Sequence, residues 1–522
     1  MVPSGGFQAA GGDRVKQVQL SAAAAAGAGD TRTAADPGAI TPRADLSTLF
    51  NFPESVHPAY RPLPTPMRVG LAVLSAMLAA ASTYTKTARL FEHNSWRKTV
   101  GLFARFALRA LIIGAMTTTV IQEAFLRPSR IDTKTLVARG WLPSSLSRFD
   151  SIQATIAIPS LGNASTELGP LGVHYLRYDS DDSSLPSRQQ RFDVLHCNHG
   201  FGASSLSWLP ALPSLAERIG ARVGLSHDAV GFGFTDRPKA SRGRKEDLIP
   251  YSLAGSAAIG AKLVTNELEK VQVEDKEQAS KSVALFGHSM GCTTTLRMAL
   301  DLPPKTRKFI VLVAPALMLP SAAAANDKAA ASTTSADNYK DAHKKRAIFP
   351  HRGRARRFVD WLLAAVRRIV VDVPFAYLLR RVVGKASGFW MSSLQSVVWG
   401  DPNDVSDTDG LRFQWPAIGR GWERGLLAFT RSRLFNVDAY PGGDVALLSD
   451  VLDLSHTSVV IIAGQNDKII PSTASENVAE RFSLPFVKLQ GRGHDPFEEN
   501  PEEFVAVIET LLKEQEMDIL NR

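Results

Sequence analysis

SVALFGHSMG, residues 282–291, joins a short apolar run to a serine that lies between two glycines. The run predicts a buried strand, and the residues after the serine predict a helix over 290–300. A serine hydroxyl becomes a useful nucleophile when a sharp strand-to-helix turn lifts it clear of the backbone beside a base. Glycines suit such a turn, because a side chain at Gly287 or Gly291 would collide with the neighbouring strand or helix. The stretch therefore predicts that Ser289 is a nucleophile.

Short glycine-serine turns are common, so the rest of the chain decides what this one means. From about Phe149 the sequence alternates short β-rich runs with helical stretches, which is typical of an α/β fold. The last four predicted strands are nearly continuous apolar or β-branched runs, as expected for a sheet buried on both faces. We predict strands over 151–158, 172–178, 192–197, 221–226, 282–286, 308–313, 458–463 and 485–489, and helices over 253–271, 290–300, 472–482 and 501–514.

The length, composition and charge of the chain limit the class of protein that it can be. The chain has 522 residues, more than one ordinary domain needs, and its composition is close to that of globular proteins. Its formal net charge of +9 is concentrated in residues 86–130 and 340–385, which predicts local anionic partners rather than a generally basic fold. Cys197 and Cys292 are the only cysteines, so we expect no disulfide framework and interpret both as buried small side chains.

The N-terminal part differs in composition from the rest. Residues 1–66 are rich in Ala, Gly, Ser and Pro, and we predict a disordered leader. A transit sequence for a plastid or a mitochondrion is the alternative, because acidic residues are sparse before Asp30. A secretory signal is not expected, since the first apolar stretch begins near Val69.

Residues 67–148 contain two apolar segments, Val69–Ala81 and Phe106–Ile121. A membrane-spanning helix needs about 20 mostly apolar residues, and these segments reach that length only if their flanks, 69–85 and 102–121, are counted. The basic residues between and within them would suit an anionic membrane face. Two interpretations stay open: a membrane anchor, with a membrane-associated intracellular location, or helices that pack on a soluble domain.

A long insertion interrupts the α/β pattern. Residues 316–446 lie between two parts of the core, 149–315 and 447–522, and we predict a helical lid there. Arginines alternate with aromatic and leucine residues in its basic region, which we interpret as a solvated face over an apolar lid core. A membrane-docking surface is the alternative. Nucleic-acid binding is not expected, because no recognition motif accompanies the charge.

The C-terminal part supplies the partners that a nucleophilic serine needs. Asp467 and His494 each follow a predicted strand, so both are expected at the edge of the sheet where parallel strands end. His494 would take the proton of Ser289 and return it to the leaving group, while Asp467 would hold the imidazole tautomer and stabilise its cation. The chain order Ser, Asp, His is the one expected on this scaffold. The backbone N–H groups of Met290 and Phe201 are the predicted donors to an oxyanion.

Five motifs occur along the chain in a characteristic order. They are H-G-F-G-A-S at 199–204, D-x-x-G-F-G-x-T-D-R-P at 228–238, G-H-S-M-G at 287–291, the acid loop at Asp467 and G-H-D at 493–495. With these motifs the chain resembles the α/β-hydrolase superfamily over about residues 150–515 outside the lid.

The resemblance implies an eight-stranded, mostly parallel sheet flanked by helices. It also implies a Ser289–Asp467–His494 triad, an oxyanion hole from Phe201 and Met290, and no cofactor. Cys292 stands where the family usually has a small residue, a departure that leaves the triad untouched.

Other polar residues near these motifs receive structural interpretations. His288 is expected to point away from the pocket and pack, and His199 to brace the oxyanion loop. His227 and Asp228 belong to a motif that is structural in the family. No His/Cys cluster shows ligand spacing, so no metal site is expected.

These observations predict a serine hydrolase that cleaves an ester or other acyl bond in a small, lipophilic substrate. A serine at the turn argues against the haloalkane dehalogenase and epoxide hydrolase branches, which use aspartate there. Acyl transfer and carbon-carbon bond hydrolysis on the same triad stay open as alternatives. Two further readings are a hydrolase-like ligand-binding protein with negligible turnover and a membrane-anchored scaffold. The sequence does not assign an oligomeric state.

Overall fold

The computed structural model describes the predicted core and part of the predicted lid. Most of 67–148 and all of the leader 1–66 lie outside the described residues, so the leader and the anchor stay predictions. Among the residues that are described, none of the helices combines the length and the apolarity that crossing a membrane requires. The described residues are 142–143, 145–158, 164–180, 190–238, 240, 245–274, 281–318, 387–419 and 421–520, with the isolated positions 70, 73, 108, 114, 375, 376 and 379.

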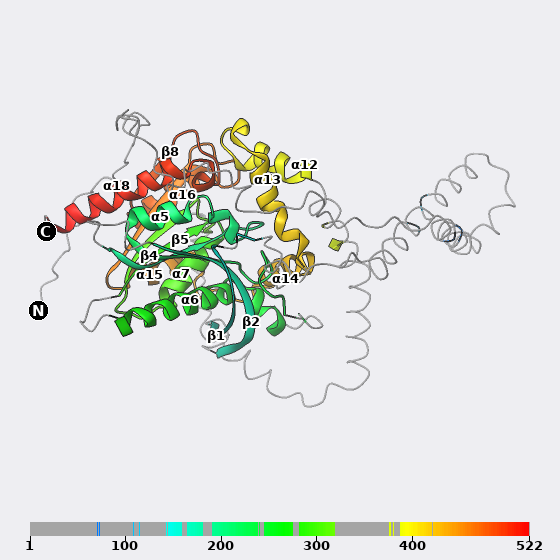
Figure 1. The fold of residues 1–522 in the computed structure, drawn as a ribbon, viewed down its shortest axis with the longest axis horizontal. Helices are drawn as coiled ribbons and strands as arrows, with labels where there is room; N and C mark the ends of the chain where they lie inside the picture. Colours follow the sequence, from blue (N-terminus) through cyan, green and yellow to red (C-terminus); the bar gives the residue numbers. More distant parts are fainter. Residues whose placement is uncertain are drawn as a thin grey trace, which may run out of the picture.

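An eight-stranded sheet forms the centre of the molecule (Figure 1). The strand order is β1-β2-β4-β3-β5-β6-β7-β8, in which β1–β2 and β2–β4 are antiparallel and the other five pairings are parallel. The predicted mostly parallel α/β-hydrolase sheet is therefore confirmed. The strands are β1 (Ser147–Ile158), β2 (Ala164–Asp179), β3 (Phe192–Asn198), β4 (Ala221–His227), β5 (Ser282–His288), β6 (Arg307–Val313), β7 (Thr457–Gly464) and β8 (Phe486–Leu489).

The central strand β5 shows why these apolar runs become strands. Every residue of β5 is buried, and successive side chains point to opposite faces of the sheet. Val283 and Leu285 join the hydrophobic cluster on one face, whereas Ala284 and Phe286 join the cluster on the other. A strand covered on both faces needs apolar side chains that point both ways, and residues 283–286 provide them.

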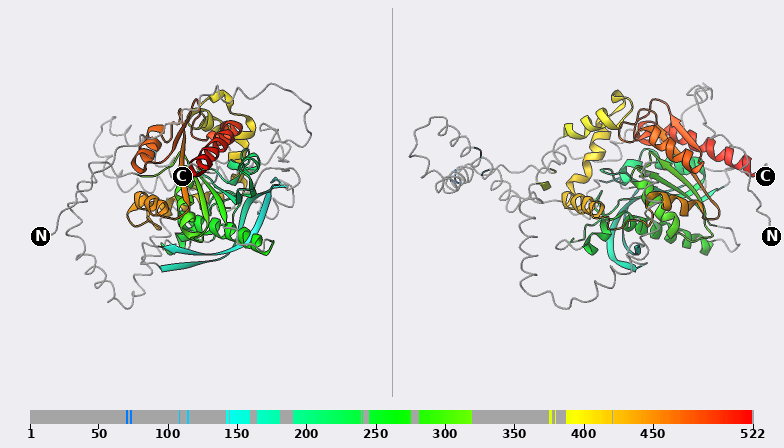
Figure 2. Two further views of the ribbon diagram at one scale, coloured as in Figure 1. Left: turned by 90° about the vertical axis from the view of Figure 1, so that its left-hand side faces the viewer. Right: turned by 180° about the vertical axis from the view of Figure 1, so that it is seen from behind.

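Helices cover both faces of the sheet, as the two further views show (Figure 2). The cluster on one face includes residues of α6 (Leu253–Glu274), α7 (Gly291–Asp301) and α15 (Gly443–Leu452). The cluster on the other face includes residues of α5 (Leu212–Ile219) and α18 (Pro501–Leu520). Further elements of the core are η4 (Ser205–Trp208), η5 (Glu246–Tyr251), α16 (Ser472–Phe482) and α17 (Pro496–Glu499).

The described part of the predicted lid is helical. Its helices gather at one end of the sheet (Figure 1, yellow to gold). One close approach to the core is between α14 and the loop after β4, where a Cβ at Gly425 would lie 2.7 Å from the Cα of Gly231. The elements are α12 (Ser387–Ser393), the π-helix η8 (Leu394–Val398), η9 (Pro402–Asp404), α13 (Asp407–Gln414), η10 (Trp415–Ile418) and α14 (Trp422–Leu434).

The substitution Gly231→Ala should loosen the lid. Gly231 has φ +104°, and an added Cβ would lie 2.8 Å from the carbonyl oxygen of Gly425. Strain and collision together should lower the free energy of unfolding by roughly 2 kcal/mol or more. The control is Gly388→Ala on α12, where nothing lies within 4 Å of an added Cβ. Urea unfolding of both variants checks this, and equal stabilities would contradict the tight lid contact.

Candidate active site

The turn between β5 and α7 holds Ser289 in a left-handed conformation, with φ 52°. Its N–H donates to the Val313 carbonyl at 2.9 Å, so β6 fixes the strained residue. A Cβ at Gly291 would lie 2.6 Å from the carbonyl oxygen of Asn198 at the end of β3. A Cβ at Gly287 would lie 2.5 Å from Thr295 Oγ1 on α7. The expected collisions with strand and helix are confirmed.

His494 and Asp467 are brought together as the sequence predicts. His494 Nδ1 lies 2.7 Å from Asp467 Oδ2, and both residues are buried. The other carboxylate oxygen, Oδ1, accepts hydrogen bonds from the N–H groups of Ile469 and Ile470, each at 2.8 Å. Because these amides fix the carboxylate, they fix the orientation of the imidazole that it holds.

The surroundings of His494 favour its protonated form. Burial alone would lower the pKa of the imidazole, but the hydrogen bond to Asp467 and the negative charges of Asp495, Asp467 and Glu499 outweigh it and raise that pKa. In the neutral ring, Nδ1–H donates to Asp467, and this tautomer leaves Nε2 as the atom that can accept a proton. The ring is therefore arranged as a base.

Ser289 lies beside this pair through its neighbour in the sequence. The rings of His288 and His494 have centroids 4.7 Å apart, so the turn and the histidine loop are in contact. Within the described residues, no hydrogen bond joins Ser289 Oγ to His494. Such bonds are often long in free enzymes and shorten when substrate binds. The structure thus joins His494 to Asp467 and brings His288, the residue before Ser289, against His494.

The predicted oxyanion loop packs directly on the turn. A Cβ at Gly200 would lie 3.2 Å from Ser289 Cβ, which places the backbone of 199–202 beside the serine. Met290 caps the N-terminus of α7. Neither the Phe201 nor the Met290 N–H donates to an acceptor among the residues described, so both are free to bind an oxyanion.

His199 braces this loop as expected. Its Nε2 accepts from the Ala229 N–H at 3.1 Å, so the proton is on Nδ1, which donates to the Gly200 carbonyl at 2.8 Å. Burial lowers the pKa of the ring, which keeps it neutral. The residue ties the oxyanion loop to the loop after β4.

Asp228 organises the loop after β4. Its buried carboxylate accepts from the N–H groups of Ser205 and Phe234, each at 2.7 Å, and lies 2.7 Å from His174 Nδ1. Burial opposes ionisation, but the charge and hydrogen bond of His174 and the amide donors outweigh it and lower the pKa of Asp228. A Cβ at Gly233 would collide with this carboxylate, which explains the glycine. The role is structural, as the motif predicts.

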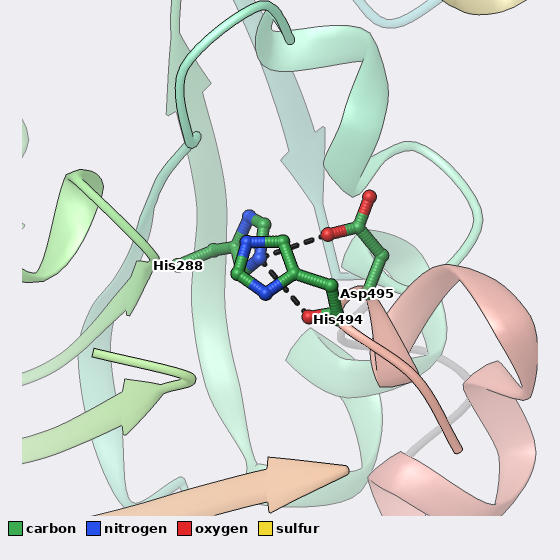
Figure 3. A group of neighbouring side chains, drawn as sticks. All are labelled: His288, His494 and Asp495. Atoms are coloured by element: carbon green, nitrogen blue, oxygen red, sulfur yellow. Dashed lines mark hydrogen bonds and ion pairs between the residues drawn. The ribbon is translucent and has the colours of Figure 1, made fainter. Parts of the chain in front are cut away.

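Sequence reasoning missed one interaction at the site (Figure 3). His288 Nε2 lies 2.8 Å from Asp495 Oδ1 and 3.1 Å from the carbonyl oxygen of His494. The interpretation of His288 as a packing residue was therefore incomplete. The G-H-D motif places Asp495 next to His494, but no pattern links it to a residue 207 positions earlier in the sequence.

The same three side chains have a spacing that a metal ion could use. Ligand atoms of His288, His494 and Asp495 lie within 4.8 Å of one another. Nε2 of His288 already contacts Asp495, and Nδ1 of His494 already contacts Asp467. We therefore assign these atoms to hydrogen bonds and ion pairs. Both cysteines are free and buried, Cys197 within β3 and Cys292 within α7.

Comparison with known proteins finds a matching family and similar solved structures. A family model described as the alpha/beta hydrolase family matches residues 194–507, more than half of the chain. Similar solved structures include a bromoperoxidase from Bacillus anthracis (15% identity, TM-score 0.37, covering 69% of this chain and 100% of the other). A meta-cleavage product hydrolase from Pseudomonas fluorescens has 15% identity and a TM-score of 0.40, and the match covers 69% of this chain and 97% of the other. An esterase from a Rhodococcus species has 15% identity and a TM-score of 0.39, with 70% and 98% covered.

The substitution Asp228→Asn should destabilise the core in a pH-dependent way. An asparagine NH2 would face groups that donate, so the free energy of unfolding should fall by about 3 kcal/mol at pH 7. Because the pKa of Asp228 is lowered by folding, its stabilisation is present above the unfolded carboxyl pKa and is lost as the pH falls below it. The gap between wild type and variant should therefore narrow below about pH 4.

Urea unfolding between pH 3 and pH 8 measures this gap. The control is Asp179→Asn, whose half-exposed carboxylate pairs with Arg177 at the surface. A surface ion pair contributes little, so this variant should stay close to wild type. An equally small effect of Asp228→Asn would contradict the structural role.

Proposed function

Because the chain belongs to the alpha/beta hydrolase family, we propose that it is a serine hydrolase that cleaves an ester or another acyl bond. The observation that carries the proposal is the 2.7 Å hydrogen bond between His494 and Asp467 beside the strained Ser289. Strain at a non-glycine residue persists where the surrounding structure enforces it, and it concentrates at functional sites. The three residues fill the roles of base, orienting acid and nucleophile.

The reaction follows from these positions. Ser289 Oγ attacks the acyl carbonyl while His494 Nε2 takes its proton, and Asp467 stabilises the imidazolium that forms. The N–H groups of Phe201 and Met290 hold the oxyanion of the tetrahedral intermediate. His494 then gives the proton to the leaving alcohol as the acyl–oxygen bond breaks. Water repeats the sequence on the acyl-enzyme and releases the acid.

We further propose a lipophilic acyl or alcohol group in the substrate and a membrane-associated location. A small apolar cluster joins the oxyanion loop to the lid, with Ala203 from the core and Leu394, Trp399 and Phe413 from the lid. Near it, Phe201 is 57% exposed, a large aromatic surface next to a predicted oxyanion donor. Apolar side chains that remain exposed beside a catalytic group favour an apolar ligand. The apolar segments in 67–148 support the membrane location.

Transfer of the acyl group to an alcohol or thiol would use the same residues. The two activities differ in what attacks the acyl-enzyme, because water gives a free acid whereas an alcohol gives a new ester. Carbon-carbon bond hydrolysis differs in the leaving group. Analysis of products separates the three reactions once a substrate is in hand.

Replacing Ser289 should remove both labelling and turnover. A fluorophosphonate should label wild type at Ser289, located by mass spectrometry of the labelled peptide, and Ser289→Ala should lose the label and p-nitrophenyl ester hydrolysis by about 1000-fold or more. The matched control is Ser226→Ala at the end of β4, a buried serine whose Oγ has no hydrogen-bond partner among the described residues. Label on another residue, or turnover kept in Ser289→Ala, would refute the assignment.

The lipophilic preference gives a separate expectation. The full chain should hydrolyse long-chain p-nitrophenyl esters with a higher kcat/KM than short-chain ones, and it should sediment with vesicles that contain an anionic phospholipid. Each methylene that enters an apolar pocket adds about 0.8 kcal/mol, so a few carbons should raise kcat/KM by about tenfold or more. Equal rates on both ester classes together with no vesicle binding would disprove the proposal.

A further inference from the structure

His288 and Asp495 form a buried polar pair in contact with the proposed base, and no step of the proposed reaction uses it (Figure 3). His288 is the last residue of β5, and Asp495 precedes α17. Their side chains are each 4% exposed and 2.8 Å apart at Nε2 and Oδ1. Buried polar groups are costly to keep unless their interactions repay the lost hydration. The pair therefore needs an explanation.

The contacts of His288 place a proton on its Nε2. Nε2 faces two acceptors, the Asp495 carboxylate and the His494 carbonyl, so it carries a proton. Nδ1 is buried and has no partner within the described residues, and a Cβ at Gly200 would lie 2.8 Å from it. His288 therefore links Asp495 to the backbone of His494 through Nε2.

The Asp495 carboxylate is kept ionised. Burial opposes ionisation, but the charge and hydrogen bond of His288 and the positive charges of His494 and Arg412 on α13 outweigh it and lower the pKa of Asp495. A buried negative charge a few ångströms from an imidazole stabilises the imidazolium.

We propose that Asp495 is a positioning residue for His494, which acts through His288 on the backbone of the histidine loop and through its charge on the protonation of the ring. This inference rests on the proposed role of His494 as the base. Asp467 orients the ring directly, while the His288 Nε2–H holds the carbonyl of His494 against the end of β5. The base is thus supported by two carboxylates from different loops.

Other charged groups face the same histidine. Asp467 lies after β7, Glu499 lies on α17, and both add negative charge. Glu498 on α17 forms a buried ion pair with Arg412 of α13 and accepts from Ser207, so its charge is offset. Arg492 in the histidine loop pairs with Glu503 and Asp404. Asp495 differs from these in its partner His288, which also contacts the backbone of His494.

The test titrates His494 directly in the full chain. Nuclear magnetic resonance of ¹⁵N-histidine-labelled protein reports each ring, and loss of one signal in His494→Gln assigns it. Asp495→Asn is an isosteric change that removes the charge. In this variant the midpoint of the His494 titration should fall by about one pH unit. The control is Asp438→Asn, a buried carboxylate that contacts Ala254, Arg297 and Arg433, and its midpoint should match wild type. A wild-type midpoint in folded Asp495→Asn would overturn the proposal.

Fluorophosphonate labelling rates measured over the same pH range add the catalytic readout. The rate should rise as His494 loses its proton, and its midpoint should move to lower pH with the titration in Asp495→Asn. If wild type takes no label but the resonance midpoint still shifts, the hydrolase proposal fails and the coupling of Asp495 to His494 stands.

A second variant covers the case in which Asp495→Asn does not fold. In His288→Met the carboxylate loses its donor, and burial should then protonate it, so the His494 midpoint should fall as well. An unchanged midpoint in the folded variant would also overturn the proposal.

Discussion

The left-handed turn at Ser289 is the constraint from which the site follows. A side chain at φ 52° costs about 1–2 kcal/mol relative to an ordinary turn. The cost is met by contacts from a strand, a helix and a loop: the serine N–H donates to β6, and its carbonyl accepts from Cys292 of α7 at 3.1 Å and from Ala316 after β6 at 3.2 Å. The glycines at 200, 287 and 291 then leave space for the approach of β3, α7 and the oxyanion loop. Without that space, Ser289 could not occupy this position in the turn.

The lid makes close contacts with the loop that carries His494, the proposed base. The His494 N–H donates to the Val398 carbonyl at 2.7 Å, and a Cβ at Gly493 would lie 2.2 Å from the same oxygen. The Glu499 carboxylate accepts from the N–H groups of Gly493 and Gly400, one on each side of this junction. Burial raises the pKa of Glu499 to about 7, against the opposing effect of these donors. Any displacement of the lid segment at Val398 would therefore move the backbone of the histidine loop.

The sequence predicts the elements that have a strong local apolar pattern and misses those in which the pattern is weak or short. All eight strands are local patterns of apolar residues, and each was predicted within a few residues except at the start of β2. The first half of β2 pairs with β1 at an edge of the sheet, where one face is exposed and the apolar signal is weak. The short helix α5 has only eight residues, too few for a clear helical period. The boundaries proposed for leader, anchor and lid remain predictions.

Some features of the site could likewise be predicted from the sequence, and others could not. Ser289, His494 and Asp467 lie in loops whose position follows from strand order, so their convergence could be predicted. The pairing of His288 with Asp495 depends on the side-chain directions of two loops distant in the sequence. Local patterns carry no such information. Asp495 follows His494 in the G-H-D motif, and the motif alone indicates no function for its carboxylate.

The two carboxylates near His494 both raise the pKa of its imidazole, and a raised pKa has two opposing consequences for a base. A higher pKa makes His494 a stronger proton acceptor, but it also leaves a smaller fraction of the ring neutral at a given pH. Asp467 combines charge with a direct hydrogen bond, so it fixes both the tautomer and the strength of the base. Asp495, which contacts His288 rather than the His494 ring, adds charge and leaves the tautomer unaffected. The arrangement therefore separates two properties of the base: one carboxylate orients the ring, and both set the pH at which it becomes available.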